Sequence, residues 1–230
     1  MLFVRENTEG EYAGVGGRAH HTLPGEVAIE VSVFTRTGVE RVLRYAFEQA
    51  ESRRGVVTSA TKSNASRFGY VLWDEVAEEV AADHSGVRYE RVLVDALAAR
   101  MVRSPGSLDV VVASNLFADI LTDLAAAIQG GMGMAASANL APETDAPGLF
   151  EPVHGSAPDI AGQGIANPAG AIWSASLMLD HLGEAGAAAA LMAALEDVCR
   201  DGPRTRDVGG SATTREVGDA VAERVASRVA

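Results

Sequence analysis

Two aspartates, Asp119 and Asp123, stand four residues apart in a segment that is otherwise almost entirely apolar. The segment that follows Asn115, LFADILTDLAAAIQ, has helical spacing, so the two carboxylates project from one face, one turn apart. Like charges at this spacing repel, and a solvated helix face is the ordinary alternative. Because the helix is otherwise apolar and follows a buried strand, the pair indicates a site for a hard cation such as Mg²⁺ or Mn²⁺, which prefers carboxylate oxygen.

A second polar cluster lies near the beginning of the chain, directly after the apolar residues Leu2-Phe3-Val4. It consists of Arg5, Glu6, Asn7, Thr8, Glu9 and Tyr12. Arginine can hold a carboxylate through two parallel hydrogen bonds, and a nearby tyrosine can donate a proton. An arginine at the end of a strand more commonly forms a surface ion pair, and this alternative stays open.

Two further charged residues, Lys62 and Asp95, each follow a predicted strand. Lys62 lies between threonine and serine in the polar stretch TKSN, and Asp95 comes at the end of the apolar stretch VLV. The ordinary explanations are a solvated lysine and an aspartate that caps a helix. Position alone does not decide between these and a role in catalysis.

The loop HGSAPD, from His154 to Asp159, contains small residues that permit close approach of a ligand to the backbone. Asp159 could accept hydrogen bonds from ribose hydroxyls, although an ordinary turn built on aspartate or proline is the more common explanation. A different stretch, GMGMAA at 131–136, matches the GxGxxA dinucleotide motif. It follows a helix instead of a strand, so we predict a helix cap and a turn there.

Strands and helices alternate along the chain, which predicts an α/β architecture. Strands are expected at 26–34, 55–59, 89–94 and 109–113, and helices at 35–50, 72–82, up to 102, 116–129, 169–182, 187–200 and from about 213. Thr35 is expected to cap the first of these helices. The run DVVVA at 109–113 is typical of a strand covered on both faces. The Pro- and Gly-rich stretch 141–168 is long for a connection and indicates a functional loop.

Charge and composition exclude several classes of partner. The 31 acidic and 19 basic residues give a net charge of −12, so the chain has no general attraction for nucleic acid or anionic membranes. The sequence shows no apolar run of membrane-spanning length and does not begin with the pattern of a secretory leader, so we expect neither membrane insertion nor secretion. With a single cysteine, Cys199, an internal disulfide is excluded, and we expect a cytoplasmic protein.

Six segments taken together resemble the isocitrate/isopropylmalate dehydrogenase family, and most closely its tartrate/D-malate dehydrogenase branch. They are VRENTEGEYAGVGGR (4–18), FTRTGVERVLRYAFE (34–48), TSATKSN (58–64), SNLFADILTDL (114–124), LFEPVHGSAPDIAGQGIANP (149–168) and DVGGSATTREVGDAV (207–221). Their order and intervals match the family pattern over essentially the whole chain. The resemblance implies that family's α/β fold, a mixed sheet flanked by helices.

The family pattern also implies roles for individual residues. Arg5 matches the arginine that holds the carboxylate of a small 2-hydroxy acid, and Tyr12 matches the tyrosine that protonates carbon after CO₂ leaves. Lys62 matches the lysine that acts with Asp95 on the hydroxyl proton. The metal ligands implied are Asp95, Asp119 and Asp123. In this family Lys62 and Asp95 reach the active site of the opposite subunit, which implies a homodimer with shared active sites.

The resemblance assigns cofactor binding to Glu151, His154, Gly155, Ala157, Asp159 and Asn167. Asp159 and Ile160 stand where members that use NADP carry lysine and tyrosine. An acidic group there accepts from a ribose 2′-hydroxyl and repels a 2′-phosphate, so NAD is the expected cofactor. The form NTEG at 7–10 differs from the LTGG form that is usual in the isopropylmalate dehydrogenases of this family.

We therefore expect NAD-dependent, metal-assisted oxidation and decarboxylation of a small 2-hydroxy acid such as D-malate or tartrate. The alternatives are a 3-isopropylmalate dehydrogenase and an inactive fragment of such an enzyme. The second arises because family members carry a further segment ahead of VRENTEG, so the fold is expected to be amino-terminally truncated. Residues 1–129 would form the dimerisation, substrate and metal domain, and residues 130–230 the carboxyl-terminal half of the cofactor-binding domain.

Overall fold

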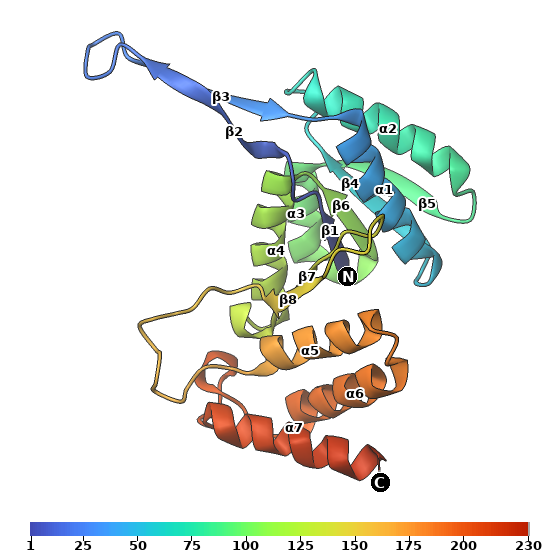
Figure 1. Ribbon diagram of the computed structural model, residues 1–230, viewed down its shortest axis with the longest axis vertical. Helices are drawn as coiled ribbons and strands as arrows, with labels where there is room; N and C mark the ends of the chain where they lie inside the picture. Colours follow the sequence, from blue (N-terminus) through green and yellow to red (C-terminus); the bar gives the residue numbers. More distant parts are fainter. Residues whose placement is uncertain (230) are drawn as a thin grey trace. The chain divides into compact units, whose positions relative to one another are not determined.

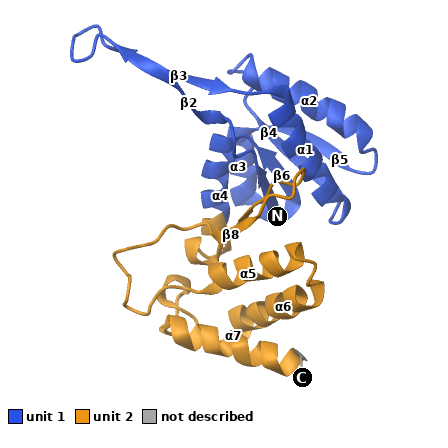
Figure 2. Ribbon diagram, in the orientation of Figure 1, with its two compact units in different colours: residues 1–125 blue, residues 126–230 orange. Residues whose placement is uncertain are grey.

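The computed structural model describes residues 1–229, and it confirms the predicted α/β architecture (Figure 1). The chain forms two compact units, residues 1–125 and 126–230 (Figure 2). The boundary expected from the sequence, after residue 129, lies four residues beyond the observed one. The roles expected for the two domains stay predictions.

The first unit is built on a parallel sheet of four strands. In spatial order the strands are β1 (Leu2–Arg5), β6 (Val110–Ala113), β4 (Val56–Thr61) and β5 (Arg88–Leu93). Neighbouring strands are parallel throughout this sheet. The antiparallel pairs of the chain form two separate two-stranded sheets, so parallel and antiparallel pairing are not mixed within one sheet.

Helices cover both faces of this sheet. They are α1 (Arg36–Glu51), α2 (Gly69–Asp83), α3 (Val94–Arg103) and α4 (Asn115–Gln129). Val110 and Val112 of β6 pack in the core formed with α1 and α2, whereas Val111 and Ala113 pack in the core formed with α3 and α4. All four side chains are fully buried, which confirms the strand covered on both faces. Burial of each valine stabilises the fold by about 1.5–3 kcal/mol.

The ends of α1 and α2 show what local sequence does and does not determine. Thr35 caps α1 as expected, because its side chain accepts a hydrogen bond from the backbone N–H of Gly38. The start predicted for α2, Leu72, is wrong, since the helix begins three residues earlier at Gly69. Tyr70, which is 3% exposed, stacks on Phe117, so tertiary packing extends the helix beyond the sequence signal.

A long antiparallel hairpin projects from the first unit (Figure 1). It consists of β2 (Gly10–Ala19) and β3 (Val27–Val33). The strand predicted at 26–34 is confirmed by β3, but β2 was not predicted because its glycines interrupt the alternation of apolar and polar residues. A Cβ atom on Gly16 would lie 2.1 Å from the carbonyl oxygen of Ile29, so the close pairing requires glycine there.

The second unit packs three helices around an apolar core. They are α5 (Ala169–His181), α6 (Ala185–Asp201) and α7 (Thr214–Val229), close to the predicted positions. Two short strands were not predicted, β7 (Ala136–Asn139) and β8 (Leu149–Pro152), which pair in antiparallel fashion. At the end of α4, Gly130 and Gly131 adopt positive φ angles and a single 3₁₀ turn follows, which confirms the predicted cap and turn.

Among residues 1–229 the longest helix is α6, with 17 residues. In the part of the chain that the structure describes, none of the helices has the length and apolar character needed to cross a bilayer.

Candidate active site

The candidate active site lies at the carboxyl ends of the parallel strands, where ligands commonly bind in open α/β sheets. Arg5 is the last residue of β1 and pairs with Ala113, the last residue of the adjacent β6. The chain then enters α4 at Asn115, two residues after β6 ends. The parallel register therefore brings Arg5 beside the first turns of α4 although the sequence separates them widely.

Two of the predicted residues, Arg5 and Tyr12, meet at a third, Asp119. A guanidinium N–H on Nη1 of Arg5 donates to Oδ1 of Asp119 at 2.6 Å. The hydroxyl of Tyr12 donates to Oδ2 of the same carboxylate at 3.0 Å. This hydrogen bond from Tyr12 to Asp119 raises the pKa of the tyrosine above its ordinary value. Tyr12 is therefore protonated at neutral pH and can act as a proton donor.

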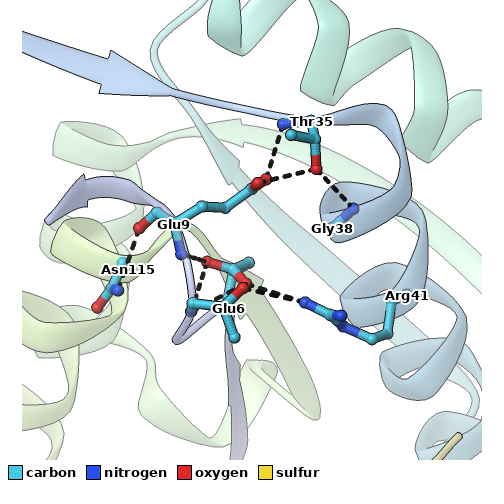
Figure 3. Close-up of polar contacts among 7 residues, drawn as sticks. Glu6, Glu9, Thr35, Gly38, Arg41 and Asn115 are labelled. Carbon is cyan, nitrogen blue, oxygen red and sulfur yellow. Dashed lines mark hydrogen bonds and ion pairs between the residues drawn. The ribbon is translucent and has the colours of Figure 1, made fainter. Parts of the chain in front are cut away.

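Asn115, which the sequence did not single out, holds the other side of the Arg5 guanidinium. Its Oδ1 accepts from Nε at 3.0 Å and from Nη2 at 2.7 Å. Its Nδ2 donates to the backbone carbonyl of Glu9 at 3.2 Å (Figure 3). Asn115 is 5% exposed, so both ends of its amide are satisfied in a buried position.

The turn between β1 and β2 is itself held by carboxylates (Figure 3). Glu6, only 2% exposed, accepts hydrogen bonds from the backbone N–H groups of Thr8 and Glu9. The carboxylate of Glu9 accepts from both the backbone N–H and the hydroxyl of Thr35, each at 2.8 Å. Because Thr35 caps α1, these bonds tie the turn to the start of that helix.

Glu11 joins the start of β2 to the start of α4. Its Oε1 accepts from the hydroxyl of Tyr70 at 2.5 Å and from Ser114 at 3.2 Å. Its Oε2 accepts from the backbone N–H of Leu116, in the first turn of α4, at 3.2 Å. The residue next to Glu11 is Tyr12, so this carboxylate fixes the strand that carries the proposed proton donor.

Lys62 and Asp95 form a second polar pair at the same edge of the sheet, after β4 and β5. Nζ of Lys62 lies 2.5 Å from Oδ1 of Asp95. The hydrogen bond from Lys62 lowers the pKa of Asp95, with a smaller contribution from the backbone N–H of Asp95 itself. The structure therefore brings these two predicted residues together and keeps Asp95 ionised.

The donor chemistry of Asp119 and Asp123 fits a divalent cation. Asp119 is partly exposed and Asp123 is exposed, so the oxygens of both carboxylates can be reached from solvent on one face of α4. Within residues 1–229 of one chain, no three acidic, histidine or cysteine side chains are arranged to hold a metal. A single chain thus does not unite Asp95 with Asp119 and Asp123 in a three-ligand site.

The predicted cofactor residues lie in or beside the loop between β8 and α5. Glu151 is in β8, where its backbone carbonyl accepts from Ser137. Nδ1 of His154 lies 2.9 Å from the carbonyl oxygen of Gly155. Ala157 adopts a positive φ of 42°. These features place the segment in a tight turn, and the exposed Asp159 lies two residues further along.

Asn167 lies at the end of this loop and lines a cavity of about 410 Å³ within the second unit. Its Nδ2 donates to Oδ2 of Asp207 at 3.0 Å, and its Oδ1 accepts from the backbone N–H of Ala169 at the start of α5. Asp207 lines the same cavity and was not predicted as a site residue. Its position within the motif DVGGSATTREVGDAV is the signal that could have identified it.

The chain belongs to the isocitrate/isopropylmalate dehydrogenase family, because the sequence model of that family matches residues 1–221. This confirms the family indicated by the six sequence segments. A crystal structure of isocitrate dehydrogenase from Methylococcus capsulatus superimposes with a TM-score of 0.90 and 42% sequence identity, covering 97% of this chain and 66% of that one.

Curated relatives agree with the tartrate/D-malate branch. The chain is 54% identical over 226 residues to a probable tartrate dehydrogenase/decarboxylase of Agrobacterium vitis, covering 98% of this chain and 63% of the relative. It is 52% identical over 224 residues to the decarboxylating D-malate dehydrogenase of Escherichia coli, covering 95% of this chain and 62% of that protein. The chain therefore spans less than two thirds of the length of these relatives.

Proposed function

We propose that this chain acts in NAD-dependent, metal-assisted oxidation and decarboxylation of a small 2-hydroxy acid such as D-malate or tartrate. The observation that carries the proposal is the convergence of Arg5, Tyr12 and Asp119 at the carboxyl edge of the sheet. Membership of the family and the names of the relatives support the same reaction.

Arg5 would bind the carboxylate of the substrate. Three of its N–H groups serve Asn115 and Asp119, which leaves one N–H on each terminal nitrogen. A carboxylate can accept from both terminal nitrogens at once, and such charge-assisted pairs are stronger than neutral hydrogen bonds. The fixed guanidinium therefore provides both affinity and orientation.

The proton steps would use two separate groups. When the hydride leaves C2 of the acid, the Lys62–Asp95 pair takes the proton of the hydroxyl group, directly or through a water molecule. The carbon–carboxylate bond then breaks, CO₂ leaves with the bond electrons remaining on carbon, and Tyr12 donates the proton that this carbon needs. The hydrogen bond from Tyr12 to Asp119 orients the protonated phenol.

Asp119 and Asp123 would hold the divalent cation, Mg²⁺ or Mn²⁺, with Asp95 as a third ligand. When bound, the cation supplies stabilisation of the negative charge that develops on the substrate oxygen. Because one chain does not bring the three carboxylates into one site, we propose a homodimer in which Lys62 and Asp95 serve the active site of the opposite subunit.

The loop of the second unit would bind NAD, which supplies the hydride acceptor when bound. Glu151, His154, Gly155, Ala157, Asp159 and Asn167 are the residues proposed for this. The turn at 154–157 and the exposed Asp159 fit a ribose that offers hydroxyl donors. A cytoplasmic location, proposed from the single cysteine, agrees with a soluble cofactor of this type.

The test is formation of NADH from D-malate, tartrate, isocitrate and 3-isopropylmalate with Mn²⁺ present. Because the chain spans less than two thirds of its relatives, two forms are assayed: this chain, and a fusion with the uncovered part of the Agrobacterium vitis relative. We expect at least one of the two forms to turn over D-malate or tartrate. Preference for 3-isopropylmalate would establish the alternative substrate, and absence of turnover in both forms would favour an inactive fragment.

A further inference from the structure

The amide of Asn115 lies between two groups that need opposite partners. On one side, Arg5 presents two N–H donors, on Nε and Nη2. On the other side, the carbonyl oxygen of Glu9 requires a donor. If the amide were reversed, its NH₂ group would face the donors of Arg5 and its oxygen would face the carbonyl. Only one orientation of the amide satisfies all these groups.

The carbonyl of Glu9 is a fixed reference point. The side chain of Glu9 is tied to Thr35 at the start of α1, and its backbone N–H donates to the buried Glu6 (Figure 3). The next residue, Gly10, adopts a φ of +79°, which only glycine reaches without strain. Asn115 therefore transmits the geometry of this turn to the guanidinium of Arg5.

We infer that Asn115 is a positioning residue for Arg5 and that it determines how strongly Arg5 binds a carboxylate ligand. It occupies the edge of the guanidinium formed by Nε and Nη2 with a neutral acceptor. Arg5 thus keeps its full positive charge while losing its freedom to rotate. This inference rests on the proposed function, because it concerns the proposed substrate-binding role of Arg5.

Because the acceptor, Oδ1 of Asn115, is uncharged, the effect of introducing a charge there can be predicted. Asn115→Asp has nearly the same shape and retains the acceptor, but it adds a negative charge beside Arg5 and removes the donor to Glu9. The new carboxylate would compete with the carboxylate of the ligand for the guanidinium. A role in folding alone would change the stability of the fold through the lost donor to Glu9, and it predicts little change in ligand binding by the folded variant.

The experiment follows the Nε–H signal of Arg5 by NMR in the ¹⁵N-labelled chain with Mg²⁺. The signal is assigned by its loss in Arg5→Lys. D-malate, tartrate and 3-isopropylmalate are titrated into the wild-type chain and Asn115→Asp. Gln49→Glu is the control, because it adds the same charge in the last turn of α1.

We expect the Arg5 signal to shift in ligand-free Asn115→Asp. The affinity of this variant for the acid should fall by about tenfold, which is close to the contribution of one hydrogen bond to a charged group. Gln49→Glu should change the affinity by less than about twofold. Asn115→Ser, which is uncharged and too short to reach Arg5, replaces the aspartate variant if that variant fails to fold, with the same weakening expected.

Unchanged affinity in a folded Asn115 variant, with a wild-type chain that binds the acid, would overturn the positioning role and leave the proposed function intact. If none of the three acids moves the Arg5 signal in the wild-type chain, the proposed substrate-binding role of Arg5 fails and the positioning role fails with it.

Discussion

The sheet edge of the first unit and the loop at 153–168 of the second unit both carry predicted site residues, but the fold holds them differently. At the sheet edge, Arg5, Tyr12 and Asp119 bind one another, and Asn115 fixes the arginine from a buried position. In the loop, the bonds within 154–163 join near neighbours, such as the one from the side chain of Gln163 to the carbonyl of Asp159, and bonds to distant residues hold only its end, as from Asn167 to Asp207.

This difference indicates two ways of preparing a site. The residues proposed to bind substrate and metal already hold one another in the chain without ligand, which would reduce the entropy lost on binding. The residues proposed to bind the cofactor include the exposed Asp159, which lies beside the turn at 154–157. Substitutions at the sheet edge should therefore affect affinity and stability strongly, whereas substitutions in the loop should mainly alter which cofactor is preferred.

The largest effect is expected from Arg5→Lys. Lysine keeps the charge but cannot form the planar, bidentate pair, and it cannot serve Asn115 and Asp119 together. Affinity for the hydroxy acid should fall by about 100-fold, which corresponds to about 2.7 kcal/mol and lies within the range for hydrogen bonds to charged groups. Titration calorimetry measures it, with Arg103→Lys at the end of α3 as the control. Equal affinity in Arg5→Lys would contradict a preformed carboxylate site.

The proposed metal site should produce the next largest effect, a rise in thermal stability. Mg²⁺ or Mn²⁺ at about 100 times its dissociation constant should stabilise the fold by about 2.7 kcal/mol, which raises Tm by several degrees. Asp123→Asn should remove most of this rise, because it eliminates one of the two carboxylates on α4. Asp219→Asn on α7 removes the same charge elsewhere and should retain the rise. A wild-type Tm that ignores both metals at saturating concentration would exclude the site.

The loop is tested through cofactor preference. In a form that turns over substrate, NAD should outperform NADP in kcat/KM. Asp159→Lys should narrow the ratio by about tenfold, because it replaces an acceptor for the 2′-hydroxyl with a partner for the 2′-phosphate. Asp145→Lys, between β7 and β8, makes the same charge change and should leave the ratio unaltered. Preference of the unmutated enzyme for NADP would refute the role of Asp159.

A smaller effect concerns the stability of the fold in acid, and it involves Asp109 at the amino end of β6. Burial alone would raise the pKa of Asp109, but hydrogen bonds from Arg53 and from the backbone N–H groups of Val56 and Arg54 outweigh it and hold this pKa below its ordinary value. A carboxyl group with a lowered folded-state pKa stabilises the fold above its unfolded pKa, near 3.9. This stability is lost as pH falls through the folded pKa.

Asp109→Asn should therefore lower the stability of the first unit by on the order of 1 kcal/mol at neutral pH and flatten its decline below about pH 4. Urea unfolding at a series of pH values measures both changes, with Asp219→Asn as the reference. An equally steep acid transition in Asp109→Asn would show that other carboxylates cause it.

The sequence alone predicted the elements and chemistry that depend on short spacing. Asp119 and Asp123 could be paired because a helix repeats every few residues, and Thr35 could be identified as a cap because capping is local. Asn115 could not be connected with Arg5, since 110 positions separate them and only the parallel register of β1 and β6 joins them. Glu11 was missed for the same reason, because its partners Ser114 and Leu116 lie more than 100 positions away.

The two short strands β7 and β8 were missed for a different reason. Each has four residues, and they lie beside and within a stretch rich in proline and glycine that resembles a loop. Their pairing is a long-range property that four residues cannot specify. The residues proposed for NAD could likewise be indicated only through the family pattern, because their individual types are those of ordinary turns.

The most direct test of the difference between the sheet edge of the first unit and the loop at 153–168 is hydrogen–deuterium exchange. It is measured on the chain alone, with NAD, and with D-malate plus Mg²⁺. We predict that peptides covering 5–12 and 115–123 exchange slowly without ligand and slow further only with the acid and metal. Peptides covering 153–167 should exchange rapidly alone and slow when NAD is added. Rapid exchange at 5–12 and 115–123 in the free chain, or a loop that is unaffected by NAD, would contradict this account.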